Sequence, residues 1–360
     1  MSDCVVIAGG GTGGHLYPAI AIAQELQREN RHIQVHFVGT PMGLEVHIVP
    51  KAGYPLHLIS VGQLNKSVGI VTRIRTLLLM PLSIFSCIRL LVKVKPKFVL
   101  GVGGYASGPF VMMAGLFGIP SALWEPNAYP GLANRILKFF VKYIFVVFPE
   151  SGKYFGGRKV IPVGLPVRAK IKYVPRTELI GRKFRVLIFG GSQGARAINK
   201  IVGEAITRDR SWYSDIEFVH QVGKFDMEWA SSVYSGIGGN VKYFQFLDDM
   251  EERYAWCDLV VCRGGISTIS ELAAAQRAGI IIPLPSAADN HQQKNAETLV
   301  NANAAQMILQ KDFNADTFKK MILDYKNHPE KLVSIETNVK RFYKPGAAEE
   351  IARLILKDVP

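Results

Sequence analysis

The residues best placed to do chemistry lie in a glycine-rich segment near the N-terminus. Gly9-Gly10-Gly11-Thr12-Gly13-Gly14-His15 follows the apolar run Cys4–Ala8, and Pro18 comes next, where it suits the first turn of a helix. Glycine permits positive φ and lets a ligand lie against bare amides, and the start of a helix attracts anions. A neutral imidazole at His15 could take a proton there. Because five of six positions are glycine, we interpret this loop as a binding site and not as a packing feature.

Two more polar segments in the first half of the chain also follow strand-like runs. They are Gly103–Pro109, which is rich in glycine, and Glu125–Arg135, which contributes a carboxylate and two amide side chains. Either segment alone would be a structural turn more often than not. Three such segments in one half of the chain favour a shared pocket.

The second half repeats this pattern. Gly190–Arg196 and Cys262–Glu271 each lie between a strand-like run and a helix-like run. Free amides there would bind a phosphate, and Glu271 could take a pair of ribose hydroxyls; the alternative is that Ser267 or Thr268 caps a helix. The polar run Asp289–Asn295 suits sugar hydroxyls, and is just as easily a helix N-terminus.

A dinucleotide site is the first alternative for the N-terminal loop. Gly9, Gly11 and Gly14 satisfy the G-x-G-x-x-G spacing, but that fingerprint expects an acid closing the second strand. Here the strand ends at Thr40 and the next acid is Glu45, which argues against NAD or FAD. Neither loop ends in glycine-lysine-Ser/Thr, so a Walker loop is excluded. The absence of an Asp-x-Asp motif and of ligand-spaced clusters gives no support for a metal or another cofactor.

Strand-like and helix-like runs alternate along the whole chain. The strand-like runs of the first half include Val35–Val38, Phe98–Val102, Ser121–Trp124, Tyr143–Phe148 and Lys159–Val163, and the pattern restarts at Arg185–Phe189. This alternation predicts an α/β protein with parallel sheets covered by helices on both faces. Two doubly wound domains facing each other across a cleft, with a linker at 164–181, fit the repeated glycine loops, which would lie at the carboxyl ends of the strands.

The composition limits the partners. The chain has 360 residues, enough for two domains, and 43 basic against 29 acidic residues give a net charge of +14. This charge favours polyanionic partners, but no recognition module for nucleic acid is visible. Four scattered cysteines fit a reducing compartment, and residues 1–15 show no signal-peptide pattern.

One basic and apolar segment, Ile70–Lys97, could meet a membrane. Its uncharged part, Thr76–Ile88, is only 13 residues long and contains Pro81, whereas a membrane span needs about 20 residues. Flanking arginines and lysines suit an anionic membrane surface. An amphipathic helix that covers a core is the alternative, and the two interpretations are compatible.

Taken together, the motifs resemble the MurG family, the peripheral membrane N-acetylglucosaminyltransferases of peptidoglycan synthesis. The matching segments run in order along nearly the whole chain: 10–15, 103–109, 125–127, 190–196 and 287–292. The resemblance implies the GT-B fold with two Rossmann-like domains. Residues 1–163 would form the acceptor and membrane domain, joined by a C-terminal helix at about 343–360, and residues 164–342 would bind UDP-GlcNAc.

The resemblance also implies an activity and a location. The enzyme would be a hexosyltransferase that moves GlcNAc from UDP-GlcNAc to the 4-hydroxyl of the muramoyl sugar of lipid I, undecaprenyl-pyrophosphoryl-MurNAc-pentapeptide, with inversion. It would work at the cytoplasmic face of the bacterial inner membrane, on its anionic surface, with cell-wall synthesis and division proteins as candidate partners. The alternatives are a GT-B relative with another UDP-sugar or lipid acceptor, and a non-catalytic nucleotide-sugar-binding protein.

The family's motifs assign roles residue by residue. Inverting transfer also needs a general base, and by its chemistry we predict His15 in that role, with Glu125 as the alternative or its partner. The resemblance also implies the substrate contacts. In the first half of the chain, Thr12, Gly13 and Gly14 would contact phosphates, Asn127 the transferred sugar, and Asn134 the acceptor. In the second half, Arg168 and Ser192 would contact the donor diphosphate, the backbone of Leu247 uracil, Ile266, Ser267, Thr268, Ile269, Ser270 and Glu271 the diphosphate and ribose, and Gln292 and Gln293 the GlcNAc hydroxyls.

Two positions depart from the family pattern. Gln276-Arg277-Ala278 stands where a glycine followed two residues later by a proline is usual, and Gly264 stands where serine is common. Both lie near the expected donor loop and put donor affinity in question.

Overall fold

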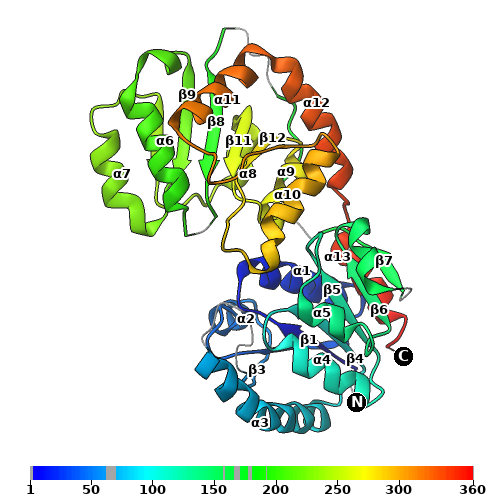
Figure 1. Cartoon of the computed structure of the whole chain (residues 1–360). Coiled ribbons are helices and arrows are strands. Elements are labelled where there is room, and N and C mark those ends of the chain that lie inside the picture. Colours follow the sequence, from blue (N-terminus) through cyan, green and yellow to red (C-terminus); the bar gives the residue numbers. More distant parts are fainter. Residues whose placement is uncertain are drawn as a thin grey trace. The chain divides into compact units, whose positions relative to one another are not determined.

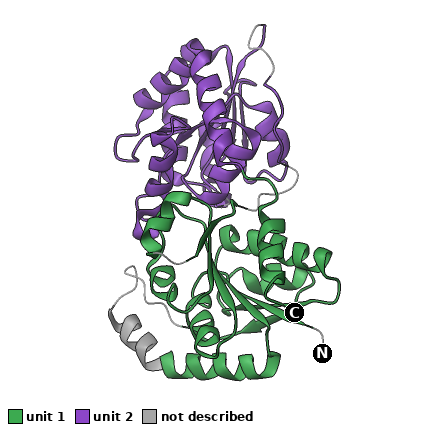
Figure 2. Ribbon diagram, turned by 90° about the vertical axis from the view of Figure 1, so that its right-hand side faces the viewer, with its two compact units in different colours: residues 1–166, 344–360 green, residues 167–343 purple. Residues whose placement is uncertain are grey.

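The chain forms two compact units, and each is described here by itself (Figures 1 and 2). The computed structural model describes residues 3–61, 70–156, 159–165, 171–176, 181–191 and 193–359, with the backbone alone described for 70–79. Unit 1 comprises residues 1–166 and 344–360, and unit 2 comprises residues 167–343.

Unit 1 is built on a seven-stranded parallel sheet with the order β3-β2-β1-β4-β5-β6-β7. Its strands are β1 Cys4–Gly9, β2 Gln34–Gly39, β3 Leu56–Leu58, β4 Phe98–Gly103, β5 Ser121–Glu125, β6 Tyr143–Val146 and β7 Val160–Pro162. Every residue of β1 is buried, as expected for a central strand that is covered on both faces. The strand order reverses between β1 and β4, which makes the carboxyl ends of these two strands the expected ligand edge.

Helices cover both faces of this sheet (Figure 1). They are α1 Gly13–Glu29, α2 Glu45–Lys51, α3 Ile70–Val94, α4 Ser107–Leu116, α5 Leu132–Leu137, the 3₁₀ helix η1 Pro149–Phe155 and the C-terminal α13 Ala347–Leu356. One core contains Val6 and Ala8 of β1 with Leu90 of α3 and Phe110 of α4. The helix α13 packs against α1 and thereby returns the end of the chain to unit 1.

Unit 2 repeats the arrangement with a six-stranded parallel sheet of order β10-β9-β8-β11-β12-β13. The strands are β8 Phe184–Phe189, β9 Ile216–Gln221, β10 Val241–Phe244, β11 Leu259–Cys262, β12 Ala278–Ile281 and β13 Gln306–Met307. The α-helices are α6 Arg196–Arg208, α7 Met227–Tyr234, α8 Met250–Trp256, α9 Ile266–Ala275, α10 His291–Asn301, α11 Ala315–Asn327 and α12 Pro329–Val339. Short 3₁₀ turns are η2 Ser211–Tyr213, η3 Lys224–Asp226, η4 Ala288–Asn290 and η5 Lys340–Phe342. The strand order of this sheet reverses between β8 and β11.

The predicted α/β class with two Rossmann-like parallel sheets is confirmed. The prediction for Pro18 is wrong, because α1 begins at Gly13 and Pro18 lies in the second turn of the helix. Its missing N–H costs one helical hydrogen bond there. Among the described residues, no helix meets the length and apolarity needed to cross a membrane.

Candidate active site

In unit 1, the two glycine loops at the expected ligand edge are locked together. Gly10 donates its N–H to the carbonyl oxygen of Gly103 at 3.1 Å. A Cβ on Gly9 would lie 2.2 Å from that same carbonyl, and one on Gly104 would lie 2.5 Å from the carbonyl oxygen of Gly10. The interpretation that the glycines of the first loop are not packing features is therefore wrong for Gly9, where no side chain fits. Gly104, in the second loop, is confined in the same way. Gly11 is different, since a Cβ there would meet nothing within 4 Å.

The helix α1 starts directly after this loop. Thr12 is its N-cap residue and makes no side-chain cap, so the amides of Gly13 and Gly14 point out of the first turn, where no helical carbonyl can accept them. His15 is the third residue of the helix, and its ring lies against Gly103, where a Cβ would come within 2.9 Å of Cε1. The structure thus brings Thr12, Gly13, Gly14 and His15 together at one helix start, where an anion is favoured.

Glu125 lies at the end of β5, and the side chain is only 2 % exposed. Its Oε1 accepts the Asn127 backbone N–H at 2.9 Å and the Asn127 Nδ2 at 3.3 Å. Its Oε2 accepts Asn134 Nδ2 at 2.9 Å and the Gly131 N–H at 3.3 Å. Burial raises the pKa of Glu125 to about 7, although these hydrogen bonds oppose the rise.

This geometry separates the two candidates for the base. Both oxygens of Glu125 are engaged by four donors, and these contacts fix Asn127 and Asn134, the two residues implied to face the sugars. Glu125 is thereby suited to positioning these amides. The same geometry favours His15 as the group that takes the proton.

Glu45 is a residue whose importance the sequence did not reveal. It is the first residue of α2 and is 1 % exposed. Its Oε2 accepts the Gly11 N–H at 2.7 Å, and its Oε1 accepts the Thr40 N–H at 2.8 Å and the Thr40 hydroxyl at 3.0 Å. The carboxylate that comes too late to bind a ribose in a dinucleotide site contacts the glycine loop instead. The signal in the sequence is that two glycines, Gly39 and Gly43, closely precede it.

In unit 2, the loop after β8 is locked in the same manner. A Cβ on Gly194 would lie 2.1 Å from the carbonyl oxygen of Val222, and one on Gly223 would lie 2.2 Å from the carbonyl oxygen of Gln193. Ser192, the predicted phosphate contact in this loop, lies outside the described residues, as does Arg168.

Gln221, at the end of β9, joins the two segments that were predicted to bind the donor. Its Nε2 donates to the carbonyl oxygen of Gly191 at 2.8 Å, and its Oε1 accepts the N–H of Leu247 at 3.0 Å. The side chain is buried, at 4 % exposed. Sequence reasoning missed this residue because its partners are 30 and 26 positions away.

The helix α9 starts at the carboxyl end of β11 with Gly265 as its N-cap residue and without a side-chain cap. The alternative that Ser267 or Thr268 caps this helix is therefore wrong. Ile266, Ser267 and Thr268 form its first turn, so their amides face the end of the helix. Glu271 lies one turn further and accepts the Tyr254 hydroxyl at 3.1 Å. Ile269 and Ser270, the remaining predicted residues of this helix, are buried.

The polar run after β12 starts α10, preceded by the short turn η4. Gln292 accepts the Leu284 N–H at its Oε1 at 3.0 Å, which leaves its Nε2 to donate to a ligand. Gln293 accepts from Asn290 at 2.9 Å and donates to Glu297 at 2.8 Å. Of the two predicted sugar contacts, Gln292 is therefore better suited to bind a sugar hydroxyl, because Gln293 already uses both its oxygen and its nitrogen in hydrogen bonds within the chain.

Both departures from the family pattern have local explanations. A Cβ on Gly264 would lie 2.5 Å from the carbonyl oxygen of Gln292, so this chain has room only for glycine there. Arg277 is 1 % exposed and donates from Nε to the Tyr254 carbonyl at 2.8 Å and from Nη2 to the Val174 carbonyl at 2.7 Å. It therefore fastens the segment 171–176 to unit 2 and does not face the donor loop.

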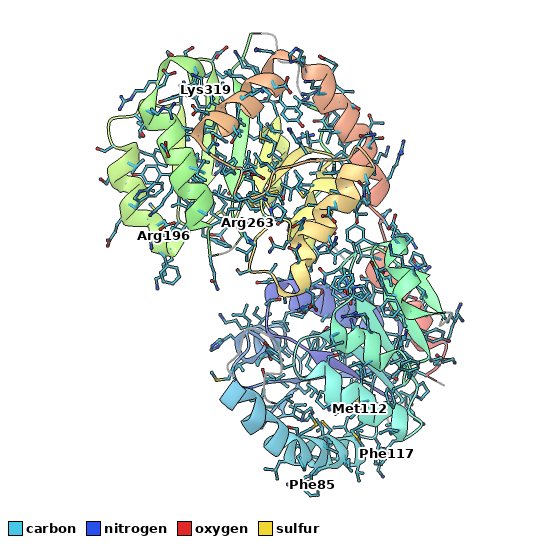
Figure 3. The ribbon with its side chains drawn as sticks, viewed as in Figure 1. Phe85, Met112, Phe117, Arg196, Arg263 and Lys319 are labelled. Carbon is cyan, nitrogen blue, oxygen red and sulfur yellow. The ribbon has the colours of Figure 1, made fainter. Side chains whose placement is uncertain are left out.

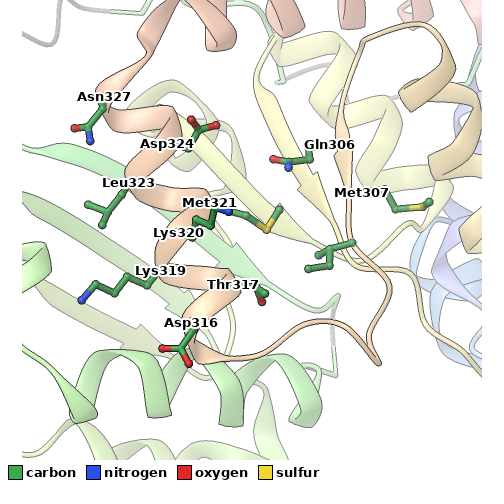
Figure 4. Close-up of a pocket in the computed structure, with 11 residues that line it drawn as sticks. Gln306, Met307, Asp316, Thr317, Lys319, Lys320, Met321, Leu323, Asp324 and Asn327 are labelled. Atoms are coloured by element: carbon green, nitrogen blue, oxygen red, sulfur yellow. The ribbon is translucent and has the colours of Figure 1, made fainter.

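A surface groove of unit 2 lies elsewhere (Figure 4). It has a volume of about 760 Å³ and is lined by residues of β13 and α11, among them Met307, Lys319 and Met321. None of the predicted site residues lines it. Within the described part of the chain, no group of three or more His, Cys, Asp or Glu side chains is arranged for a metal ion.

Comparison with known proteins identifies the family. Residues 5–146 match the glycosyltransferase family 28 N-terminal domain, and residues 185–351 match the glycosyltransferase family 28 C-terminal domain. The UDP-N-acetylglucosamine–N-acetylmuramyl-(pentapeptide) pyrophosphoryl-undecaprenol N-acetylglucosamine transferase of Bdellovibrio bacteriovorus is 48 % identical over 353 residues, covering 98 % of each chain. The Myxococcus xanthus transferase of the same name is 43 % identical and covers 97 % of this chain and 91 % of its own length. The chain belongs to the MurG family.

Solved structures agree with this assignment. The Acinetobacter baumannii MurG structure superposes with a TM-score of 0.81 at 28 % identity, covering 99 % of both chains. A UDP-GlcNAc 2-epimerase from Neisseria meningitidis, bound to UDP-GlcNAc, reaches a TM-score of 0.68 at 14 % identity, with 99 % of this chain and 100 % of that one covered. The second likeness shows the fold alone. The GT-B fold expected of a MurG family member, and a glycosyltransferase activity, are thus confirmed.

Proposed function

We propose that this chain transfers GlcNAc from UDP-GlcNAc to the 4-hydroxyl of the muramoyl sugar of lipid I, which gives lipid II and UDP with inversion at the sugar. The observation that carries the proposal is the 48 % identity to a transferase of that name over 98 % of both chains. The product would serve peptidoglycan synthesis, and through it cell shape and division.

Unit 1 supplies the base and the acceptor contacts in this proposal. His15 accepts the proton of the 4-hydroxyl while the oxygen of that hydroxyl forms a bond to C1 of GlcNAc. The bond between C1 and the diphosphate oxygen breaks, and UDP leaves with the electron pair. The amides of Gly13 and Gly14 and the side chain of Thr12 lie beside the phosphates. Asn127, held by Glu125, contacts the transferred sugar, and Asn134 lines the acceptor side.

Unit 2 binds the donor. Because the N–H of Leu247 is taken by Gln221, we assign its carbonyl oxygen to the N3–H of uracil. The amides at the start of α9 stabilise the leaving diphosphate, together with Ser192 and Arg168, and Glu271 takes the ribose hydroxyls. Gln292 donates from Nε2 to a GlcNAc hydroxyl, with Gln293 beside it.

A transfer assay tests this function directly. Radiolabelled UDP-GlcNAc and a lipid I analogue should yield labelled lipid II with the wild-type chain. His15→Ala should lower kcat on the order of 10²- to 10⁴-fold, because general-base catalysis is lost, while the affinity for UDP stays unchanged. Donor binding without turnover by the wild type would support a non-catalytic binding protein, and near-normal turnover of the variant would remove His15 from the mechanism.

We also propose that unit 1 docks on the anionic cytoplasmic face of the inner membrane. Large apolar side chains are exposed on and after the helices α3, α4 and α5, which pack side by side: Phe85 at 65 %, Phe117 at 51 % and Phe139 at 63 %. Figure 3 shows Phe85 and Phe117 at the same end of unit 1. Basic residues adjoin them, including Arg89 of α3 and Lys138 after α5. Exposed apolar side chains among cations suit a surface of anionic lipid.

Vesicle sedimentation tests the docking surface. Replacing Phe85 and Phe117 with serine should reduce binding to vesicles that contain phosphatidylglycerol several-fold. Phe225→Ser is the matched control, since Phe225 is an exposed phenylalanine of unit 2, at 82 %. Equal binding by all three proteins would refute the assignment. Three arginines, Arg73, Arg75 and Arg89, flank the uncharged part of the segment Ile70–Lys97. The side chains of Arg73 and Arg75 lie outside the described residues, so Arg89→Glu is the charge variant of choice, and it should also weaken vesicle binding.

A further inference from the structure

We propose that Glu45 is a positioning residue of the reaction: its carboxylate fixes the glycine loop of unit 1 and, through the loop, the start of the helix that carries His15. The proposal rests on the proposed function, because it concerns how that reaction's base is placed. It differs from a catalytic role, since Glu45 contacts the loop and not a reacting atom.

The carboxylate lies in a pocket made by glycines. A Cβ on Gly10, Gly39 or Gly43 would come within 2.4, 2.5 or 2.0 Å of an atom of the Glu45 side chain. Gly10 belongs to the loop after β1, Gly39 is the last residue of β2, and Gly43 lies between β2 and α2. Three glycines from two segments thus make the space for one acid. Part of the glycine richness of the first loop is explained by Glu45 and not by a ligand.

The contacts of Glu45 connect the two segments. Its Oε1 takes both donors of Thr40, and its Oε2 takes the N–H of Gly11 at 2.7 Å. Gly11 has a φ of +88°, and a Cβ on it would meet nothing within 4 Å, so side-chain packing does not fix this residue. The hydrogen bond to Glu45 therefore fixes the loop at this residue. A buried carboxylate needs such donors, so the pocket and the loop stabilise each other.

The position of Gly11 links this contact to catalysis. Gly11 is followed by Thr12, the N-cap residue of α1, and His15 comes one helical turn later. If the N–H of Gly11 were released, the first turn of α1 could shift relative to Gly103, against which the His15 ring lies. A misplacement of about 1 Å can cost on the order of 100-fold in rate.

Two variants and a control separate positioning from simple stability. Glu45→Gln keeps the shape but places an NH₂ group against the N–H donors of Gly11 or Thr40. Glu45→Asp keeps the charge and withdraws the carboxylate, and serves if the glutamine variant does not fold. Thr40→Val is the matched control, because it removes one donor to Oε1 and leaves the contact with Gly11 intact.

The measurements are kcat, KM for UDP-GlcNAc, UDP affinity by calorimetry and amide exchange of the peptide around 9–20. We expect Glu45→Gln to lower kcat per folded molecule 10- to 100-fold, with KM for UDP-GlcNAc and UDP affinity unchanged and exchange in the peptide faster. The kcat of Glu45→Asp should lie between that of the wild type and that of Glu45→Gln. The kcat of Thr40→Val should stay within about twofold of the wild-type value.

Wild-type kcat in the Glu45 variants would overturn the proposal, as would a uniform loss of stability, UDP affinity and turnover. If the wild type transfers no GlcNAc, the proposed function fails. Amide exchange then still decides whether Glu45 fixes the loop, since that measurement needs no substrate.

Discussion

Each unit has a glycine loop after its first strand. The two loops have similar backbones, but a charged carboxylate holds the loop of unit 1 and a neutral amide side chain holds the loop of unit 2. Each has one glycine locked against a neighbouring loop, Gly9 in unit 1 and Gly194 in unit 2. Each also has an open glycine with positive φ, Gly11 at +88° and Gly191 at +95°. In unit 1, the N–H of the open glycine donates to a carboxylate. In unit 2, its carbonyl accepts from the neutral amide of Gln221.

The difference follows the charge of the expected ligand. A carboxylate near a diphosphate would repel it by about 4 kcal/mol per pair of unit charges at 4 Å in an effective dielectric of about 20. The amide of Gln221 donates to a carbonyl oxygen of the loop, so it adds no charge and leaves the N–H groups of the loop available. The attachment in unit 2 is therefore compatible with a diphosphate beside the loop. In unit 1, the Glu45 carboxylate is buried and accepts three hydrogen bonds, so it can fix the loop that places His15 while the amides of Gly13 and Gly14 remain available to the phosphates.

The same contrast extends to the buried ionisable groups. Unit 1 buries Glu125, whose pKa rises to about 7, and unit 2 buries His220, whose pKa falls to about 3, in both cases mainly because of burial. Neutral His220 is held by Tyr234 and Asn199, at 2.9 and 3.0 Å. The comparison thus predicts opposite responses to pH.

The largest expected effect is on the pH dependence of unfolding. The pKa of His220 is about 3 in the folded chain and 6.5 in the reference state, so the unfolded state binds more protons between these values. Stability should fall as pH is lowered through this window, by up to about 5 kcal/mol. The pKa of Glu125 is about 7 against 4.5, so the folded state binds more protons. The contribution of Glu125 to the free energy of unfolding should therefore be lost as the pH rises from 4.5 to 7, by up to about 3 kcal/mol.

Urea unfolding at a series of pH values checks both signs. His220→Gln can retain both hydrogen bonds and should flatten the acid side of the stability curve, whereas Glu125→Gln should flatten the side between 4.5 and 7. Tryptophan emission serves as the readout, with Trp124 in unit 1 and Trp212, Trp229 and Trp256 in unit 2. If both substitutions altered the same side of the curve, the contrast between the units would be wrong.

Gln221 gives the next largest effect. Gln221→Glu should weaken UDP binding about 100-fold, because it replaces the donor to Gly191 by a charge beside the phosphates. The variant can still accept the Leu247 N–H, so uridine should lose much less affinity than UDP. Gln221→Met, which is neutral and lacks both contacts, should cost about 10-fold for either ligand.

Calorimetry with UDP and with uridine separates these contributions. An equal loss for both ligands in Gln221→Glu would mean that charge near the loop is unimportant, and the electrostatic explanation of the comparison would fall. A tolerated Gln221→Met would show that the loop and the segment of Leu247 keep their places without this side chain.

Local patterns were enough to predict much of this architecture. Buried apolar runs followed by glycines predicted the strands, and parallel strands bring their carboxyl ends to one edge, which gathers the loops after β1, β4, β8 and β11. The predicted residue His15 accordingly meets Gly103, and Gln292 meets Gly264.

The contacts that attach the loops could not be predicted, because they join distant positions. Glu45 is 34 residues from Gly11, and Gln221 is 30 residues from Gly191. Neither the period of a strand nor the spacing of a motif encodes such a pair. Pro18 was misplaced because α1 already begins at Gly13, so the proline lies in the second turn and one helical hydrogen bond is missing.

The smallest expected effect concerns the open glycines themselves. Gly11→Ala and Gly191→Ala should each cost about 1 to 2 kcal/mol of stability, because an L-residue is strained at these positive φ values while its Cβ meets nothing within 4 Å. Thermal unfolding measures both losses. Gly191→Ala should also weaken UDP binding, and Gly11→Ala should leave it unchanged.

Equal losses of stability would mean that the two loops use the same backbone conformation and differ only in what attaches them. A much larger loss for Gly11→Ala would show that the carboxylate of Glu45 resists distortion of its loop more than the amide of Gln221 does. Such a result would agree with the stronger hydrogen bond expected of a charged acceptor. The function of unit 1 would then depend on a rigid loop, and that of unit 2 on a loop that adapts to the diphosphate.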